Sequence, residues 1–224
     1  MSLEAPRPTG DGGDDPLAWV TIPALAEVLG QHPGGALPAT SARALYRLVR
    51  RIRPSAALEI GLGQGASTLA VLQALQELGG GRLVCVEQRR SAPGLARLRS
   101  SGLLSQIELH LQPSHLALPR LLQKGVRIQF AFLDGRHLFD YLLVDLFYCD
   151  LLLDVGGVLV CDDARWPGLE KAVRFFESNR AYERVGGLPR RLAALRKLGD
   201  DQRGRRTGRL RNDFEGTGKT FVDF

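Results

Sequence analysis

Three glycines, Gly61, Gly63 and Gly65, follow a short apolar run and alternate with other residues. Because glycine has no Cβ and tolerates tight turns, such a loop lets the backbone approach a ligand closely. The residues from Ser67 onward are helix-like, so the segment predicts a strand, a tight turn and a helix start. This arrangement is typical of a nucleotide site in a doubly wound sheet. The third glycine of the dinucleotide fingerprint is replaced by Ala66, which a phosphate loop tolerates, so the loop predicts a nucleoside-type ligand without deciding which.

Polar residues stand at the end of each predicted parallel strand. An acidic residue about 20 residues beyond a glycine loop is placed to accept hydrogen bonds from ribose hydroxyls, and Glu87 has this position. The carboxyl ends of parallel strands form one edge of a sheet, where ligands bind. The residues expected at this edge are Glu59, Glu87, Ser114, Asp134, Asp162 and Asp163. The sequence therefore predicts a functional site along that edge.

The elements that would position these residues alternate between strands and helices. Strands are expected over 56–60, 82–87, 107–111, 128–133 and 155–163; those over 82–87 and 128–133 are of the buried type, and 107–111 alternates apolar and polar residues. Helices are expected over 17–29, 40–52, 91–101, 115–123, 138–152 and 168–179, with Thr40 or Ser41 as the N-cap of the second. Such alternation predicts an α/β fold with a parallel sheet and right-handed crossovers. Two short strands over 182–185 and 192–197 would add an antiparallel edge.

The length and composition predict one domain with flanking segments. The chain has 224 residues, of which 44% are hydrophobic, enough for an α/β domain with a sizeable core. We predict a flexible leader and a short N-terminal helix over 1–39, the main domain over 40–198 and a polar tail over 199–224. The leader and the tail are rich in Gly and charged residues and have no hydrophobic periodicity.

Charge and cysteine usage restrict the partners and the compartment. The formal net charge is +6, but the arginines are interleaved with acids along the chain, so we expect a solvated surface and no nucleic-acid partner. Cys85, Cys149 and Cys161 lie in apolar segments without metal-ligand spacing, which is typical of core residues in a reducing compartment. No signal-like start and no apolar run of membrane-spanning length is present, so we expect a cytoplasmic protein that does not insert into membranes.

Taken together, these residues resemble the class I S-adenosylmethionine-dependent methyltransferases over about residues 40–198. Within that class, 132–137 and 156–163 are similar to the small-molecule O-methyltransferases, which include the catechol-type and cephalosporin-hydroxylase-like groups. The resemblance implies a Rossmann-like, doubly wound, mainly parallel seven-stranded sheet with an antiparallel C-terminal edge hairpin. It rests on the glycine loop, on acids after two strands and on a glycine pair before the last parallel strand: Glu59, Gly61, Gly63, Gly65, Ser67, Thr68, Glu87, Asp134, Gly156 and Gly157.

The resemblance implies S-adenosylmethionine as cofactor and assigns its contacts. The methionine and ribose portion would face the glycine loop, the ribose hydroxyls would face Glu87, and Asp134 would also border the cofactor. Ser114 and His115 would border the adenine, although a serine at a helix start could serve only as a cap. The remaining cofactor residues would be Glu59, Gly61, Gly63, Gly65 and Ser67.

The resemblance also raises a divalent-metal site. In the catechol-type enzymes, an aspartate after the fourth strand and an acidic pair after the fifth bind a cation, and Asp134, Asp162 and Asp163 match these positions. Mg²⁺ or another hard cation would hold the acceptor oxygens and lower the hydroxyl pKa. Where that group has a lysine base, this chain has His137, whose neutral imidazole can accept a proton near pH 7. This departure leaves the metal dependence open, because the acidic pair could instead cap the next helix.

We therefore expect an enzyme that transfers a methyl group to an oxygen of a small molecule. Arg136, Arg165 and Trp166 flank the edge and could shape the acceptor pocket. One alternative is a nicotinamide-dependent oxidoreductase on a similar fold, and another is a non-catalytic, nucleoside-binding module. A nucleic-acid methyltransferase is disfavoured because the Asn/Asp-Pro-Pro-Tyr/Phe signature is absent. The N-terminal helices could form a lid or a homodimer contact.

Overall fold

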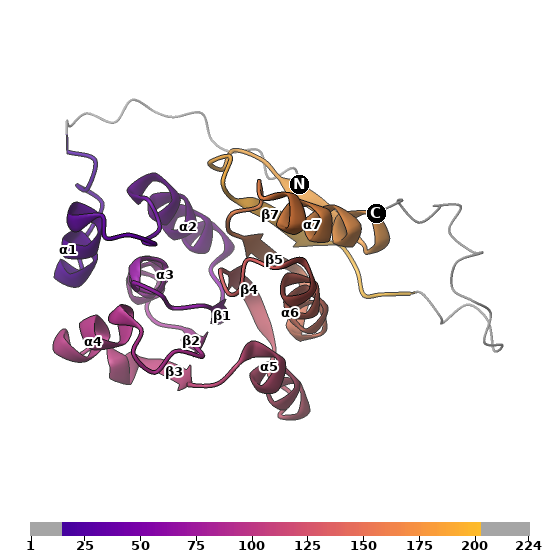
Figure 1. The fold of residues 1–224 in the computed structure, drawn as a ribbon, viewed down its shortest axis with the longest axis horizontal. Coiled ribbons are helices and arrows are strands. Elements are labelled where there is room, and N and C mark those ends of the chain that lie inside the picture. Colours follow the sequence, from indigo (N-terminus) through magenta and orange to yellow (C-terminus); the bar gives the residue numbers. More distant parts are fainter. Residues whose placement is uncertain (1–14, 203–224) are drawn as a thin grey trace.

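The fold is organised around one seven-stranded sheet, shown in Figure 1 for a computed structural model that describes residues 15–202. The strand order is β3-β2-β1-β4-β5-β7-β6, and β7 runs antiparallel to both of its neighbours. The strands are β1 (Ala56–Ile60), β2 (Arg82–Val86), β3 (Ile107–His110), β4 (Ile128–Leu133), β5 (Leu153–Cys161), β6 (Tyr182–Val185) and β7 (Ala193–Lys197). The predicted Rossmann-like sheet with an antiparallel C-terminal hairpin is confirmed. Residues 1–14 of the predicted leader and 203–224 of the predicted tail lie outside the described residues.

Helices cover both faces of the sheet (Figure 1). One face carries α1 (Pro23–Gln31), α2 (Ala39–Ile52), α3 (Ala66–Glu77), α4 (Pro93–Ser100) and the short 3₁₀ helix η1 (Leu104–Gln106). The other carries α5 (Ser114–Gln123), α6 (Phe139–Leu152) and α7 (Pro167–Asn179). Each layer has its own hydrophobic cluster, and α1 packs into the same cluster as the helices of the predicted main domain.

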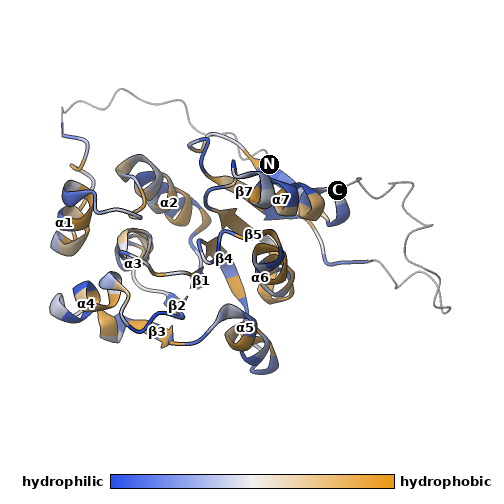
Figure 2. Cartoon of the chain, in the orientation of Figure 1, coloured by the Kyte–Doolittle hydropathy of each residue, from blue (hydrophilic) through white to orange (hydrophobic). Residues whose placement is uncertain are grey.

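The apolar strands follow from this two-sided burial. In β4, Phe130 and Phe132 belong to one cluster, whereas Ala131 and Leu133 belong to the other. Successive side chains of a strand point to opposite faces, so a strand covered on both sides needs a continuous apolar run. Figure 2 shows hydrophobic residues concentrated on the strands and on the helix sides that face them. The apolar runs therefore mark central strands, and their polar ends mark the sheet edge.

The first helix differs from the prediction of a helix over 17–29, because α1 begins only at Pro23. Residues 16–19 before it form a turn, and the next residues are bound by a buried side chain of α3. The backbone N–H groups of Thr21 and Ile22 donate to the Gln73 side-chain oxygen, at 2.8 and 3.2 Å. This tertiary contact takes donors that a helix would otherwise use, and Pro23 suits a helix start.

Two further local predictions are wrong. No side chain caps α2, whose N-cap is Pro38, so Thr40 and Ser41 lie inside its first turn. The pair Gly156-Gly157 is not a turn before the last parallel strand but lies within β5, where the register against β4 shifts. A Cβ on Gly157 would lie 2.9 Å from two backbone oxygens, so the irregularity requires glycine there.

Two findings on the described residues bear on the predictions about membranes and cysteines. None of their helices is long and apolar enough to cross a membrane. The three cysteines, Cys85, Cys149 and Cys161, are buried free thiols, which agrees with their predicted place in the core.

Candidate active site

A cavity of about 500 Å³ lies at the carboxyl ends of the parallel strands. Its lining comes from the segments that follow β1 to β5, from the loop before β7 and from Gly35 between α1 and α2. The volume falls within the range of roughly 300–1,000 Å³ that is usual for small-molecule sites. Of the residues assigned from the sequence, Gly61, Gly63, Glu87, Ser114, His115, Asp134, His137 and Asp163 line it. Glu59, Gly65, Ser67 and Asp162 do not line it but stand behind its wall.

The glycine loop is fixed by its neighbours as well as shaped for a ligand. Gly61, Gly63 and Gly65 all have positive φ angles, of 90°, 49° and 87°. A Cβ on Gly61 would lie 2.0 Å from the backbone oxygen of Asp134, and one on Gly65 would lie 3.2 Å from the Cα of Gly94. By contrast, a Cβ on Gly63 would meet nothing within 4 Å. Packing therefore demands two of the glycines, whereas the third borders open space in the cavity.

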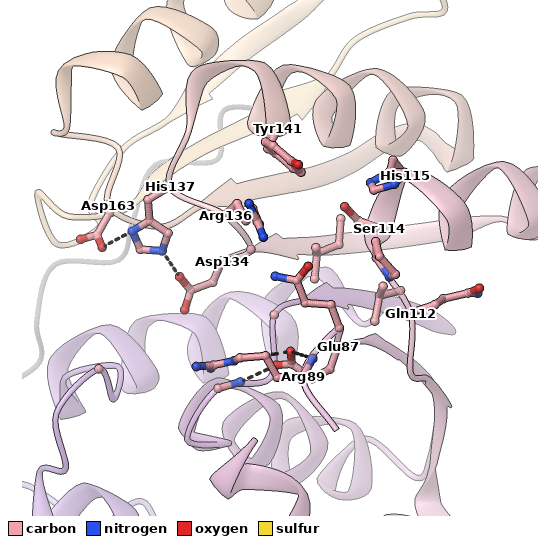
Figure 3. Close-up of a pocket in the computed structure, with 18 of the residues that line it drawn as sticks. Glu87, Arg89, Gln112, Ser114, His115, Asp134, Arg136, His137, Tyr141 and Asp163 are labelled. Carbon is pink, nitrogen blue, oxygen red and sulfur yellow. Dashed lines mark hydrogen bonds and ion pairs between the residues drawn. The ribbon is translucent and has the colours of Figure 1, made fainter. Parts of the chain in front are cut away.

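Glu87 ties this loop to the end of β2. Its carboxylate is buried and accepts three backbone N–H groups: Oε2 from Leu62 and Gly63, at 3.0 and 3.1 Å, and Oε1 from Arg89, at 2.7 Å. Figure 3 shows the side chain at the floor of the cavity beside Arg89. Charge-assisted bonds of this kind are stronger than bonds between neutral groups. Glu87 therefore holds the shape of the loop, in addition to any contact with a ligand.

Glu59 lies next to the same loop but does not line the cavity. It is 1% exposed and faces the first turn of α3, where the positive end of the helix dipole favours a negative charge. Burial raises the pKa of Glu59 to about 7, whereas the neighbouring Ser67, Thr68 and Cys85 act to lower it. Cys85 Sγ lies 3.5 Å from Oε2, and within the described residues Oε1 has no hydrogen-bond partner. Glu59 and Ser67 thus support the loop from behind.

One end of the cavity is formed by the start of α5 and by α6. Ser114 does not cap α5, because the N-cap is Pro113 and no side chain bonds there. Asp145 of α6 is buried nearby, and burial raises its pKa to about 6, whereas Ser114 acts to lower it. The rings of His115 and Tyr141 meet edge to face, with centroids 6.3 Å apart, and the Arg136 guanidinium lies over the Tyr141 ring. This end therefore offers flat aromatic surfaces and a cation.

The opposite end carries the acidic residues, joined by His137 (Figure 3). His137 Nε2 lies 3.1 Å from Asp134 Oδ1, and Nδ1 lies 3.1 Å from Asp163 Oδ2. Because ionised carboxylates only accept hydrogen bonds, contacts at both ring nitrogens favour the imidazolium. Accordingly, the hydrogen bond with Asp134 raises the pKa of His137, while burial raises the pKa of Asp134 to about 6. Trp166 packs edge to face on the imidazole, with ring centroids 5.3 Å apart.

Asp162 is paired with an arginine that the sequence analysis did not single out. Arg191 Nε lies 2.6 Å from Asp162 Oδ1, and Nη2 lies 2.5 Å from Oδ2. Nη2 also lies 3.3 Å from Asp163 Oδ2. Within residues 15–202, no three His, Cys, Asp or Glu side chains are arranged to hold a metal ion. The arrangement does not fit a cation bound jointly by Asp134, Asp162 and Asp163.

Several lining residues gave no signal in the sequence. Arg191 stands in the loop between β6 and β7 and reaches the site because its backbone oxygen accepts from the N–H of Ala164, at 3.0 Å. Gly35 reaches the cavity from the α1–α2 loop, where Gln64 donates to the backbone oxygen of Gly34, at 3.1 Å. Of the three residues expected to flank the acceptor, Arg136 and Trp166 line the cavity and Arg165 does not. Gln88, Arg89, Gln112 and Tyr141 also line the cavity and were not among the predicted site residues.

The chain is similar to a family of methyltransferase domains and to solved O-methyltransferases. Residues 58–164 match the model of a family described as a methyltransferase domain. The O-methyltransferase TomG of Streptomyces achromogenes, solved with S-adenosylmethionine, is similar at 23% identity and a TM-score of 0.66, over 80% of this chain and 92% of that one. An O-methyltransferase of Bacillus cereus, solved with S-adenosylhomocysteine, is similar at 20% identity and a TM-score of 0.64, over 81% and 95%. None of the curated proteins compared matches the chain.

The family match and the similarity to solved structures both point to methyltransferases. The solved structures share the fold, and the family match runs from Leu58 within β1 to just after β5, a range that contains the glycine loop, Glu87 and the acidic residues. The resemblance predicted from the sequence is confirmed at the level of the fold: the chain has the fold of the class I S-adenosylmethionine-dependent methyltransferases, and its residues 58–164 match the model of a methyltransferase domain.

Proposed function

We propose that the protein is an S-adenosylmethionine-dependent O-methyltransferase that acts on a small molecule. The observation that carries the proposal is that one cavity joins the glycine loop and Glu87 to the Asp134–His137–Asp163 group. A methyl donor and an acceptor hydroxyl need these two regions next to each other, because the transfer requires in-line alignment and removal of a proton.

The residues present fit the cofactor. Gly63 leaves open space beside the loop, and Glu87 stands where ribose hydroxyls could donate to its carboxylate. The aromatic end of the cavity, at His115 and Tyr141, suits the adenine ring, which stacks on flat side chains. The solved TomG and Bacillus cereus enzymes contain S-adenosylmethionine and S-adenosylhomocysteine, which supports the same ligand here.

The acidic end would handle the acceptor proton. When bound, S-adenosylmethionine supplies an electrophilic methyl group on its sulfonium. His137 and Asp134 form a hydrogen-bonded pair that has to lose a proton before it can take one from an acceptor hydroxyl. The His137–Asp134 pair would keep the acceptor proton, while the bound cofactor would give its methyl group to the acceptor oxygen and leave as S-adenosylhomocysteine. Asp163 holds the other ring nitrogen and so keeps the imidazole in place.

The neighbouring side chains support a small acceptor. Trp166 is 53% exposed and packs against His137, so it presents an apolar surface beside the proposed base. Arg136 lines the same cavity. The metal-assisted form of the reaction has no such support, because His137 and Arg191 already pair with the three carboxylates.

The strand order argues against the nicotinamide alternative. Dinucleotide-binding Rossmann sheets have the order 3-2-1-4-5-6, whereas here an antiparallel strand, β7, stands between β5 and β6. The other alternative, a non-catalytic nucleoside-binding module, predicts cofactor binding without turnover.

Calorimetric titrations with S-adenosylmethionine, S-adenosylhomocysteine and NAD test the cofactor. We expect the two S-adenosyl compounds to bind, Glu87→Ala to weaken them, and NAD not to bind. Formation of S-adenosylhomocysteine with a panel of phenols and catechols then tests transfer, with His137→Ala as the variant expected to lose it. Preference for NAD would overturn the assignment, and tight cofactor binding with no turnover on any hydroxylated compound would favour the non-catalytic module.

A further inference from the structure

Arg191 closes the acidic end of the cavity from the side of β7. Its guanidinium engages both oxygens of Asp162 in a fork, at 2.6 and 2.5 Å, and reaches Asp163 at 3.3 Å. The Asp162 side chain is 0% exposed, whereas that of Arg191 is 28% exposed and lines the cavity. The arginine therefore lies between the buried carboxylate and the space in which an acceptor would bind.

This is the place where the resemblance would put a divalent cation. A hard cation needs carboxylate oxygens with open lone pairs. Here the Asp162 oxygens both face Arg191, and His137 bridges Asp134 and Asp163. A fork of two parallel N–H···O bonds is the strongest common geometry between arginine and a carboxylate. To bind at Asp162, a cation would have to displace the guanidinium from both oxygens of a fully buried carboxylate and break two charge-assisted hydrogen bonds.

We infer that Arg191 takes the place of the divalent cation, so that the acidic group is closed to metals and methyl transfer is metal-independent. The inference rests on the proposed function for the identity of the reaction, but its central claim concerns only this chain's side chains. Within residues 15–202, Nη1 of Arg191 makes no hydrogen bond, so its two N–H groups remain to donate to an acceptor oxygen. A fixed guanidinium stabilises negative charge that develops on that oxygen without any metal ligand.

The test is direct binding of Mn²⁺ to the full-length protein, followed by the loss of the electron paramagnetic resonance signal of free Mn²⁺. The variants are Arg191→Ala, the same change combined with Asp162→Asn, and Arg190→Ala as a matched control on the exposed neighbouring arginine. We expect the wild type and Arg190→Ala to take up no Mn²⁺ up to roughly 1 mM. Arg191→Ala should bind Mn²⁺ with a dissociation constant at least about tenfold below that concentration. Adding Asp162→Asn should abolish the gained site.

Uptake of Mn²⁺ by the wild type that Asp162→Asn removes would overturn the inference. So would an Arg191→Ala variant that melts as a folded protein and gains no site. If Arg191→Ala does not fold, Arg191→Gln replaces it, since glutamine keeps a donor to Asp162 and removes the charge. Titration of each sample with S-adenosylmethionine separates the two proposals. Failure of the wild type to bind the cofactor would contradict the proposed function, whereas cofactor binding with metal uptake would contradict only the role of Arg191.

Discussion

Replacing Glu87 by glutamine tests the buried acid that connects the glycine loop to β2. The carboxylate accepts three backbone N–H groups, at 2.7, 3.0 and 3.1 Å, so both of its oxygens are in use. Glutamine has nearly the same shape, but its amide nitrogen is a donor. If its oxygen stays with the loop, the nitrogen faces the N–H of Arg89, which then loses its acceptor.

The expected cost follows from these three bonds. A hydrogen bond to a charged group contributes about 1.5–3 kcal/mol, and the two bonds that remain lose their charge assistance. Glu87→Gln should therefore lower the free energy of unfolding by about 2–4 kcal/mol. For a domain of this size that corresponds to a melting temperature lower by roughly 5–15 °C. The affinity for S-adenosylmethionine should fall as well, because the loop loses its anchor and the ribose loses a charged acceptor.

Thermal unfolding followed by circular dichroism, together with calorimetric titration of the cofactor, measures both effects. Glu108→Gln is the matched control, because Glu108 stands on β3 and pairs with Arg82 and His110 outside the cavity. It is partly exposed, so its loss should cost less than about 1 kcal/mol and leave the cofactor affinity unchanged. Equal shifts for the two variants, or a Glu87→Gln protein that melts and binds like the wild type, would refute the anchoring role.

Three further substitutions probe the loop, the base and a buried acid. Gly94→Ala should lower the free energy of unfolding by about 1–3 kcal/mol and weaken cofactor binding, because its Cβ would lie 2.8 Å from Gly65 N and 2.9 Å from Gly63 O. Urea unfolding measures the loss, and Gly30→Ala is the control, because a Cβ there meets nothing within 4 Å. Since the hydrogen bond with Asp134 raises the pKa of His137, the transfer rate should fall as the pH drops through that raised pKa, and His137→Gln should flatten this limb of the pH–rate profile; a limb that survives the substitution would rule His137 out. Burial raises the pKa of Asp145 to about 6, so between about pH 4 and 6 the unfolded chain releases a proton that the folded protein retains, and stability falls as the pH rises through this window. Asp145→Asn should therefore be more stable than the wild type by about 2–3 kcal/mol at pH 8 but not at pH 3.5, and an equal difference at both pH values would contradict this linkage.

Most of the fold was predictable because its causes are local. Strands buried on both faces require continuous apolar runs, and β4 (Ile128–Leu133) begins and ends where the sequence analysis placed it. Where the prediction was wrong, a contact with a residue distant along the chain changed the local structure. The N–H groups of Thr21 and Ile22 bond to Gln73 of α3 and delay the first helix. Position 157 has no room for a Cβ partly because the backbone oxygen of Gln129 in β4 lies 2.9 Å away, and Gln129 is distant along the chain.

The candidate site divides in the same way. The sequence by itself determined that a glycine loop, Glu87 and several acids would meet at one edge, because parallel strands bring their carboxyl ends together whatever the helices between them contain. Only the tertiary structure decided which of these residues face the cavity and which, like Glu59 and Asp162, stand behind its wall. It also decided what balances the acidic charge. Arg191 is far from Asp162 along the chain, and the antiparallel pairing of β7 with β5 brings the arginine onto the carboxylate. Charge balance depends on distances in space, and the spacing of residues along the chain does not contain them.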